Sequence, residues 1–191
     1  MTRNEFVDLM RLSVVDPAEG GRQLLAFDAP LAVRWMLLVA TVLGSVVLLY
    51  SVPVMTGDLG ELPSPFGFAA TQAVMNVVVI TLIAIVGRAF GGEGNFGDAL
   101  WLMGWLQTLT AGLLILQIVA VLVLPGLGMP IGVASVALSI WVLVGYVCAV
   151  HGFKSRILVL VSGIMTFVLL SFALSVILLF LGYGPEDLTN V

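Results

Sequence analysis

The segment from Gly92 to Gly97 has the spacing GxGxxG, which lets a backbone turn approach a pyrophosphate in dinucleotide-binding proteins. That chemistry needs a strand before the turn and a helix after it, because the helix N-terminus holds the phosphates. Here the apolar stretch 62–87 precedes the turn, and no strand–helix–strand pattern occurs in the chain. We therefore interpret the segment as a tight turn between helices, in which Asn95 caps the second helix and Asp98 occupies its third position.

His151 is the only histidine of the chain, and it stands close to Lys154 and Arg156. One histidine does not make a metal site, and no carboxylate lies within a helical turn of it. The residue could cap backbone carbonyls at a helix end, which is the interpretation we favour. Alternatively, the three residues could grip anionic lipid headgroups or a partner protein, and Arg88 could likewise contact a headgroup phosphate.

Four amide side chains interrupt stretches that are otherwise apolar. Gln72 and Asn76 lie one helical turn apart, Gln117 is expected level with Gln72, and Gln107 level with Thr81. Such amides form interhelical hydrogen bonds, worth about 0.6 kcal/mol on average, or line a path for a small neutral solute or lipid headgroup. No ionisable residue lies within these stretches, which disfavours ion-coupled transport.

The elements that carry these residues follow from the distribution of charge. The chain is 61% hydrophobic and 9% charged with a mean hydropathy of +1.20, and residues 35–57, 62–87, 99–150 and 157–185 contain no Asp, Glu, Lys or Arg. A bilayer core takes about 20 apolar residues as a helix. The third stretch is about twice that length and is broken by prolines and glycines at 125–130. The sequence therefore predicts an all-α integral membrane protein with five spans, near residues 31–50, 66–86, 99–124, 131–150 and 157–181.

All seven Lys and Arg residues fall before or at the very start of the first predicted span, between the second and third, or between the fourth and fifth. By the positive-inside rule, the N-terminus is expected in the cytoplasm and the C-terminus outside. Residues 1–30 are expected to form a cytoplasmic tail with short amphipathic helices, residues 31–182 the membrane domain and residues 183–191 an outer tail. One short helix is expected at 4–15 on the membrane surface, and Asp16 followed by Pro17 is a good start for another.

Gly104, Thr108 and Gly112 place small residues at intervals of four along the third predicted span. Such ridges let helix backbones approach closely inside a bilayer, so we expect this span at the centre of the bundle. Serine, cysteine and carboxylate arrangements typical of catalysis do not occur, which predicts no enzymatic activity, no metal and no cofactor. No basic patch is present, and nucleic acid is not expected as a partner.

Several short motifs resemble the Yip family of Rab-GTPase-interacting membrane proteins, and its bacterial branch most of all. They are Asp16-Pro17, the segments 87–92, 96–100 and 104–107, and His151-Gly152-Phe153. The resemblance implies a fold of five membrane helices, a cytoplasmic N-terminus and, for the bacterial branch, an inner-membrane location. Family members commonly carry a proline inside the third span after a Gly-Tyr pair, whereas Gly104-Trp105 is followed by no proline before Pro125.

The first functional hypothesis is a non-enzymatic membrane protein that organises the bilayer or partner proteins through its cytoplasmic loops. A membrane protein partner or a second copy of the chain would bind there. The alternatives are a small-solute or lipid transporter or channel lined by the four amides, and an accessory subunit of a larger membrane complex. The residues expected on the partner or headgroup surface are Arg88, Gly91, Gly92, Glu93, Asp98, His151, Lys154 and Arg156.

Overall fold

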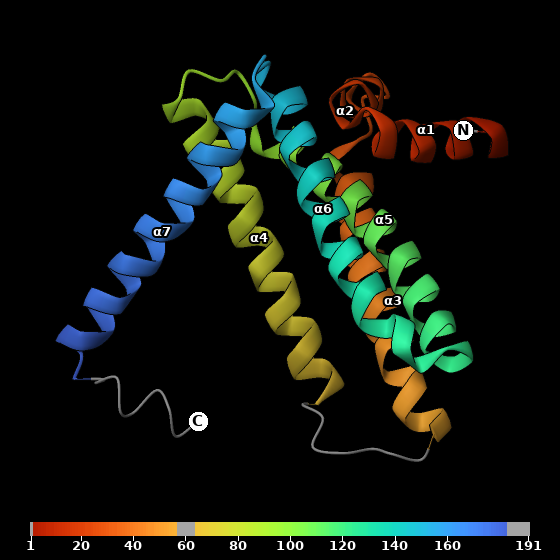
Figure 1. The fold of residues 1–191 in the computed structure, drawn as a ribbon. Helices are drawn as coiled ribbons and strands as arrows, with labels where there is room; N and C mark the ends of the chain where they lie inside the picture. Colours follow the sequence, from red (N-terminus) through yellow and green to blue (C-terminus); the bar gives the residue numbers. More distant parts are fainter. Residues whose placement is uncertain (1, 57–63, 183–191) are drawn as a thin grey trace. The chain divides into compact units, whose positions relative to one another are not determined.

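The structure, a computed structural model, describes residues 2–56 and 64–182 and divides into two compact units, residues 1–154 and residues 155–191. Each unit is described by itself. The described part of the chain contains helices and no strands, which confirms the predicted all-α class. In chain order (Figure 1), the first unit holds α1 (Arg3–Val15), α2 (Pro17–Leu25), α3 (Leu31–Thr56), α4 (Pro65–Ala89), α5 (Phe96–Val123), the short 3-10 helix η1 (Pro125–Leu127) and α6 (Gly128–His151), and the second unit holds α7 (Arg156–Phe180).

Five helices, α3 to α7, are long and apolar enough to cross a bilayer, which confirms the five predicted spans. Their ends lie within a few residues of the predicted ones, except that α3 continues past Tyr50 to Thr56 with Pro53 inside it. The 3-10 turn η1 separates α5 from α6 where the prolines and glycines predict a break. The predicted outer tail, residues 183–191, lies outside the described residues.

Side-chain caps fix where several helices begin. The Asn95 side chain accepts a hydrogen bond from the Asp98 N–H at 3.0 Å and donates one to the Asp98 carboxylate at 2.6 Å, as the predicted capping role requires. The Asp16 carboxylate accepts from the Glu19 N–H at 3.3 Å, with Pro17 as the first residue of α2. These bonds satisfy N–H groups that have no partner inside a helix.

Helix α5 packs along α3, α4 and α6 within the first unit, in agreement with the expected central position. Leu100 and Leu102 of α5 are fully buried, as are Ile80 of α4 and Val142 of α6. At Gly104 the helices approach closely, since a Cβ atom there would lie 3.2 Å from the Leu37 side chain of α3. This position therefore serves the helix packing that its spacing predicts.

Gly112 and Thr108 behave differently from Gly104. Gly112 is exposed, and nothing in the described structure lies within 4 Å of a Cβ atom built on it. The Thr108 hydroxyl donates to the Gly104 carbonyl oxygen of its own helix at 3.0 Å. Eight residues of a straight α-helix turn Gly112 about 80° around the axis away from Gly104. The predicted ridge is therefore not one continuous contact, and the expected packing role of Gly112 is wrong within this unit.

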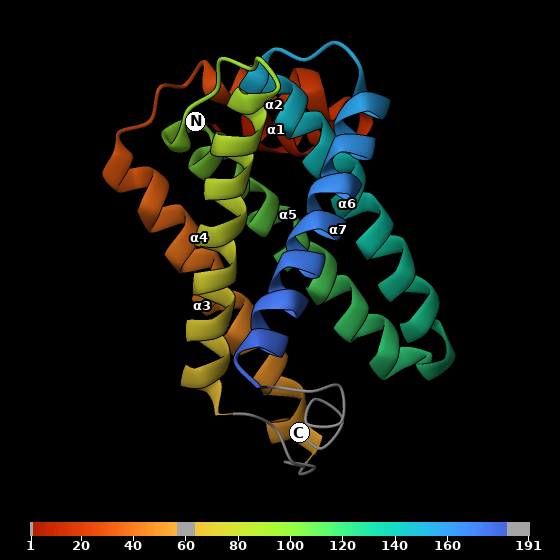
Figure 2. The ribbon, with the colours of Figure 1, turned by 90° about the vertical axis from the view of Figure 1, so that its left-hand side faces the viewer.

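The N-terminal residues pack onto the membrane helices rather than forming a separate tail. Helices α1 and α2 lie across the ends of α5 and α6 (Figures 1 and 2), with Leu9, Ser13 and Leu24 buried. Gly20 and Gly21 lie buried inside α2, where their missing side chains allow close contact with neighbouring helices. A Cβ atom on Gly21 would lie 2.7 Å from the Ala149 Cβ atom of α6.

Three indole N–H groups attach these N-terminal helices to the spans. Trp101 donates to the Leu24 carbonyl oxygen at 2.8 Å, Trp105 to the Ser13 hydroxyl at 3.2 Å, and Trp141 to the Val14 carbonyl oxygen at 3.0 Å. An indole ring is apolar but its N–H group needs a hydrogen-bond partner when it leaves water. The acceptors of these three hydrogen bonds all belong to α1 and α2. Both short helices are therefore part of the domain.

Helix α7 constitutes the described part of the second unit. Its first N–H groups are served by Ser155, whose hydroxyl accepts from the Leu158 N–H at 3.3 Å. Hydroxyl groups along it, such as those of Thr166 and Ser175, donate to carbonyl oxygens one turn earlier. Polar side chains are thereby satisfied inside the helix, as a segment surrounded by hydrocarbon requires.

The contact at Gly104 leads to a prediction about stability. Gly104→Leu forces a side chain against Leu37, so we expect the free energy of unfolding to fall by about 1–3 kcal/mol. The matched control is Gly44→Leu on α3, where a Cβ atom has no neighbour within 4 Å. Thermal melting of both variants in detergent checks this. If Gly104→Leu melts at the same temperature as Gly44→Leu, close approach at Gly104 is not needed for the contact between α3 and α5.

Candidate functional site

The turn between α4 and α5, residues 90–95, is built by glycines. Gly91 has a φ of +85°, which a residue with a side chain rarely adopts. The Gly91 N–H donates to the Arg88 carbonyl oxygen and the Gly92 N–H to the Gly87 carbonyl oxygen, both at 2.9 Å. Helices flank the turn on both sides, so the GxGxxG spacing serves a helix connection, as we interpret it from the sequence.

His151, the last residue of α6, is inserted into this turn and is only 3% exposed. Its Nδ1 atom accepts a hydrogen bond from the Gly94 N–H at 3.1 Å. The neutral ring therefore carries its hydrogen on Nε2, which lies 2.9 Å from the Ile83 carbonyl oxygen of α4 and donates to it. One imidazole thus joins the end of α6 to both α4 and the turn.

Three glycines make the space that the His151 ring occupies. A Cβ atom on Gly87 would lie 2.2 Å from the ring Nε2, and one on Gly92 would lie 2.5 Å from the His151 Cβ atom. On Gly94 it would lie 2.3 Å from the Val150 side chain. No side chain fits at these positions, so the glycines and the histidine depend on one another.

Two further contacts complete the junction. The Arg88 Nε–H donates to the Gly94 carbonyl oxygen at 2.8 Å, so both backbone groups of Gly94 have partners. The Phe153 ring stacks on the imidazole with 5.4 Å between ring centroids. Gly152, with a φ of +72°, ends α6 in the left-handed conformation typical of helix C-termini and turns the chain toward this stacking.

The residues predicted on the partner surface separate into two groups. Arg88, Glu93 and Lys154 are exposed at the junction, together with Gly91. His151 is buried, which corrects its predicted place on that surface, because the surrounding glycines let the ring sink into the turn. It bonds a carbonyl of the neighbouring α4 rather than capping its own helix. Gly92 is one of the three glycines that surround the His151 ring. Arg156 belongs to the second unit.

Asp98 is engaged inside the fold rather than offered to a partner. The Arg34 guanidinium donates to its carboxylate at 2.8 Å and, through Nε, to the Ala29 carbonyl oxygen at 2.7 Å. The Arg34 side chain is 11% exposed, so this ion pair links the start of α3 to the start of α5 in a largely shielded place. Sequence reasoning missed Arg34, although an arginine one turn into an apolar span is itself a signal of a paired charge.

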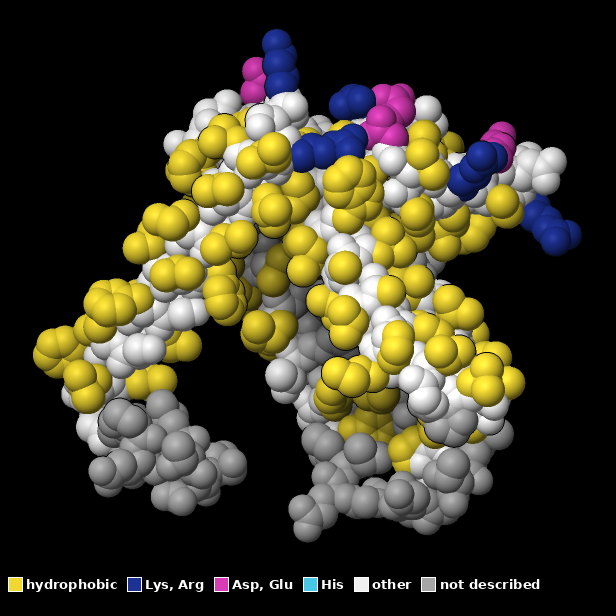
Figure 3. Space-filling view, in the orientation of Figure 1, with side chains coloured by type: hydrophobic (Ala, Val, Ile, Leu, Met, Phe, Trp, Pro, Cys, Tyr) yellow, Lys and Arg dark blue, Asp and Glu magenta, His cyan; other side chains and the backbone are white. Residues whose placement is uncertain are grey.

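Charged side chains gather at the end of the first unit where α1, α2 and the 90–95 turn lie, and hydrophobic side chains cover the surface beyond it (Figure 3). On α2, hydrogen bonds from Arg22, at 2.7 Å, and from Gln23 lower the pKa of Glu19. Among the described residues, no group of three or more His, Cys, Asp or Glu is arranged to hold a metal ion.

The amides meet inside the bundle in an arrangement that differs from the expected levels. Gln107 of α5 donates to the Asn76 side-chain oxygen of α4 at 2.6 Å rather than lying level with Thr81. Because α4 ends at Ala89 and α5 begins at Phe96, the two amides lie about 20 Å and about 17 Å from the turn. Asn76 is 6% exposed and donates in turn to the Gln72 carbonyl oxygen at 2.9 Å.

The two remaining amides have other partners. Gln72 donates to the Ser45 hydroxyl of α3 at 3.5 Å, while its side-chain oxygen is buried with no hydrogen-bond partner among the described residues. Gln117 lies 3.4 Å from the carbonyl oxygen of Gly128, where α6 begins, and donates to it. The four amides therefore do not form one continuous row, since Gln117 serves the α5–α6 turn.

Comparison with known proteins gives one family. The model of the Yip1 domain family matches residues 12–177, from the second half of α1 to the last turns of α7. No curated protein and no solved structure matches the chain.

The histidine junction leads to a second prediction. His151→Leu leaves the Gly94 N–H and the Ile83 carbonyl oxygen without partners, at a cost of about 1–3 kcal/mol for each group. We expect a lower melting temperature and faster hydrogen exchange in peptides that cover residues 90–97. Gly94→Ala should act in the same direction, and Gly112→Ala, with open space around it, is the control. Unchanged exchange in His151→Leu would mean that the turn holds its shape without the imidazole.

Proposed function

We propose that this chain, which belongs to the Yip family as its Yip1 domain shows, organises the membrane or partner proteins through the end of the domain that carries α1 and the 90–95 turn. It is a multi-pass membrane protein, and we propose that it does this without catalysis. We propose a bacterial inner membrane as its location, and the resemblance to the bacterial branch supports this. Its partner would be another membrane protein or a second copy of the chain.

The observation that carries the proposal is the bond between His151 and Gly94. Two segments that are 57 residues apart in the chain are held together by a buried side chain, so the exposed residues around it keep a fixed spacing. Arg88, Glu93 and Lys154 are those exposed residues. A surface with both charge signs in fixed positions favours a specific protein partner, because complementary charges select the partner and its orientation.

The distribution of basic residues supports a cytoplasmic position for this surface. Arg88 lies at the end of α4 and Lys154 three residues after His151, so both adjoin the 90–95 turn, and the opposite ends of α3 to α6 carry no basic residue among those described. The positive-inside rule assigns such an end to the cytoplasm. A cytoplasmic surface is open to both membrane and soluble partners.

The first test is cross-linking in the membrane followed by affinity purification and mass spectrometry of proteins and lipids. Lys154→Glu combined with Glu93→Lys keeps the net charge and reverses both signs, so we expect a specific cross-linked protein to be reduced about tenfold. The control is Arg3→Glu on α1. A partner captured equally by all three proteins would place the contact elsewhere, and capture of no protein would count against the proposal.

The transporter alternative makes the opposite prediction for the amides. The half-buried Gln107 donates to the buried Asn76, which supports a structural role. We therefore expect Gln107→Leu to lower the free energy of unfolding by about 1–3 kcal/mol, because it leaves the Asn76 oxygen unpaired. Thermal melting checks this, with Gln117→Leu as the control, because the Gln117 bond to the Gly128 carbonyl oxygen is longer, at 3.4 Å. Unchanged melting together with loss of solute uptake by vesicles would favour the transport path.

One observation favours the accessory-subunit alternative as a second candidate. Ala40 and Gly44, one turn apart on α3, are both exposed, and a Cβ atom on Gly44 has no neighbour within 4 Å. Small residues on an open helix face allow another membrane helix to approach closely. Cross-links from this face of α3 to a different membrane protein, in a fixed ratio to this chain, would be the expected result.

A further inference from the structure

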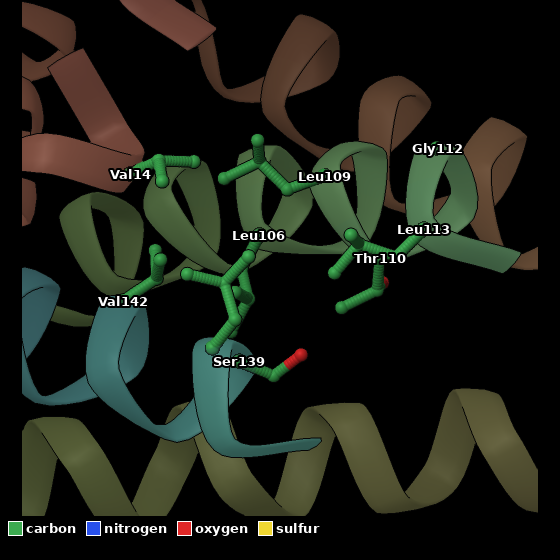
Figure 4. Close-up of a pocket in the computed structure, with 9 residues that line it drawn as sticks. Val14, Leu106, Leu109, Thr110, Gly112, Leu113, Ser139 and Val142 are labelled. Atoms are coloured by element: carbon green, nitrogen blue, oxygen red, sulfur yellow. The ribbon is translucent and has the colours of Figure 1, made fainter. Parts of the chain in front are cut away.

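A groove of about 120 Å³ lies between α5 and α6 beside the end of α1 (Figure 4). Val14 of α1 lies at one end of it, and Gly112 and Leu113 lie at the other. Its other walls are aliphatic, mainly Leu106, Leu109, Leu138 and Val142. From Leu106 to Leu113 the groove follows α5 for about 10 Å, at 1.5 Å per residue.

The two hydroxyl groups on the wall of the groove do not make it polar. The Thr110 hydroxyl points to Gln107. It donates to the Gln107 carbonyl oxygen at 3.0 Å, and the Gln107 side-chain oxygen lies 3.1 Å from it as a second acceptor. The Ser139 hydroxyl donates to the Ser135 carbonyl oxygen at 2.7 Å. The wall therefore offers a polar solute no free hydrogen-bonding group, and burying a polar group without a partner is unfavourable. The occupant that this lining suits is therefore a hydrocarbon chain rather than a polar solute.

Helix α1 carries a cation close to Val14, the residue with which it lines the groove. Arg11 lies one helical turn before Val14, so the two side chains are neighbours on the helix surface. Arg3, Val7 and Arg11 follow one another at intervals of four, which places two cations along an exposed apolar edge of α1. No ion pair among the described residues uses Arg11, whereas Glu5 turns back to cap the start of the helix.

We propose that this groove binds a glycerophospholipid, with one acyl chain between α5 and α6 and the phosphate at Arg11. A cation on a helix that lies at the interface binds a headgroup phosphate, and the apolar side of such a helix faces the acyl chains. The site is separate from the partner surface around His151, and it does not depend on the proposed function. It would fix a lipid of the leaflet at the α1 end.

The position of α1 distinguishes a lipid from a second protein helix. A transmembrane helix that followed the groove would have to continue into the headgroup region, where the end of α1 closes the groove at Val14. Trp141 holds α1 in this place through its bond to the Val14 carbonyl oxygen at 3.0 Å. An acyl chain ends at the headgroup, so a lipid fits a groove that is closed on this side and exposed at Gly112.

Native mass spectrometry of the full chain with dioleoylphosphatidylglycerol tests the proposal. The wild type should retain one lipid, and Gly112→Leu, which fills the groove, should reduce its occupancy about tenfold. Arg11→Gln should reduce it about fivefold and remove the preference over a dioleoyl galactolipid that lacks phosphate. Gly44→Leu, an exposed glycine on α3, is the matched control and should retain the lipid as the wild type does.

A second measurement on the wild type does not depend on the folding of any variant. Phosphatidylglycerol with a diazirine on its acyl chain, in vesicles of phosphatidylglycerol and phosphatidylethanolamine, should cross-link mainly to residues 106–113 and 138–142. Cross-links spread evenly over all spans, or full lipid retention by Gly112→Leu, would overturn the proposal. A change of oligomeric mass in Gly112→Leu without loss of lipid would mean that a second copy fills the groove. Equal binding of both lipids by the wild type would exclude the phosphate contact.

Discussion

The cytoplasm-facing surface proposed for this protein depends on one buried imidazole whose two nitrogens both bond to backbone groups. Backbone N–H and C=O groups near the hydrocarbon need partners inside the protein, because water does not reach them. The His151 ring accepts a hydrogen bond from the Gly94 N–H of the turn and donates one to the Ile83 carbonyl oxygen of α4. Gly87, Gly92 and Gly94 leave the space for that ring, and Arg88 serves the remaining carbonyl of Gly94. Three helix ends are thereby joined without any buried charge.

The N-terminal helices complete the same end of the domain. Tryptophans commonly lie at the membrane interface because their rings are apolar and their N–H groups need a partner. Here Trp101, Trp105 and Trp141 find those partners in α1 and α2, so interfacial residues become structural ones. The Yip1 domain match begins at residue 12, inside α1, and agrees with a domain that includes α2. The resulting position of α1 brings Val14 to the α5–α6 groove, with Arg11 one helical turn before it.

Several polar side chains deeper in the first unit have partners inside it, although the buried Gln72 side-chain oxygen has none among the described residues. Asn76 and Gln107 bridge α4 and α5, and the hydroxyls of Thr110 and Ser139 are bonded within their own helices. Such bonds specify which helix faces meet, although each contributes little stability, about 0.6 kcal/mol on average. The surfaces that remain open, at Gly44 and along the α5–α6 groove, are apolar. The groove is suited to a lipid and the face at Gly44 to another membrane helix, and neither is suited to a polar solute.

The sequence by itself determined the class of protein and its five spans, because charge-free stretches of bilayer length permit few other structures. It also determined the caps at Asp16 and Asn95, which depend only on residues three positions apart. Only the tertiary structure decided that His151 is buried, that Asp98 pairs with Arg34, and that Gly112 is open while Gly104 is packed. Each of these depends on how helices cross and how far one is shifted along another. Neither quantity is written in the local spacing of residues, and a shift of one turn changes which side chains meet.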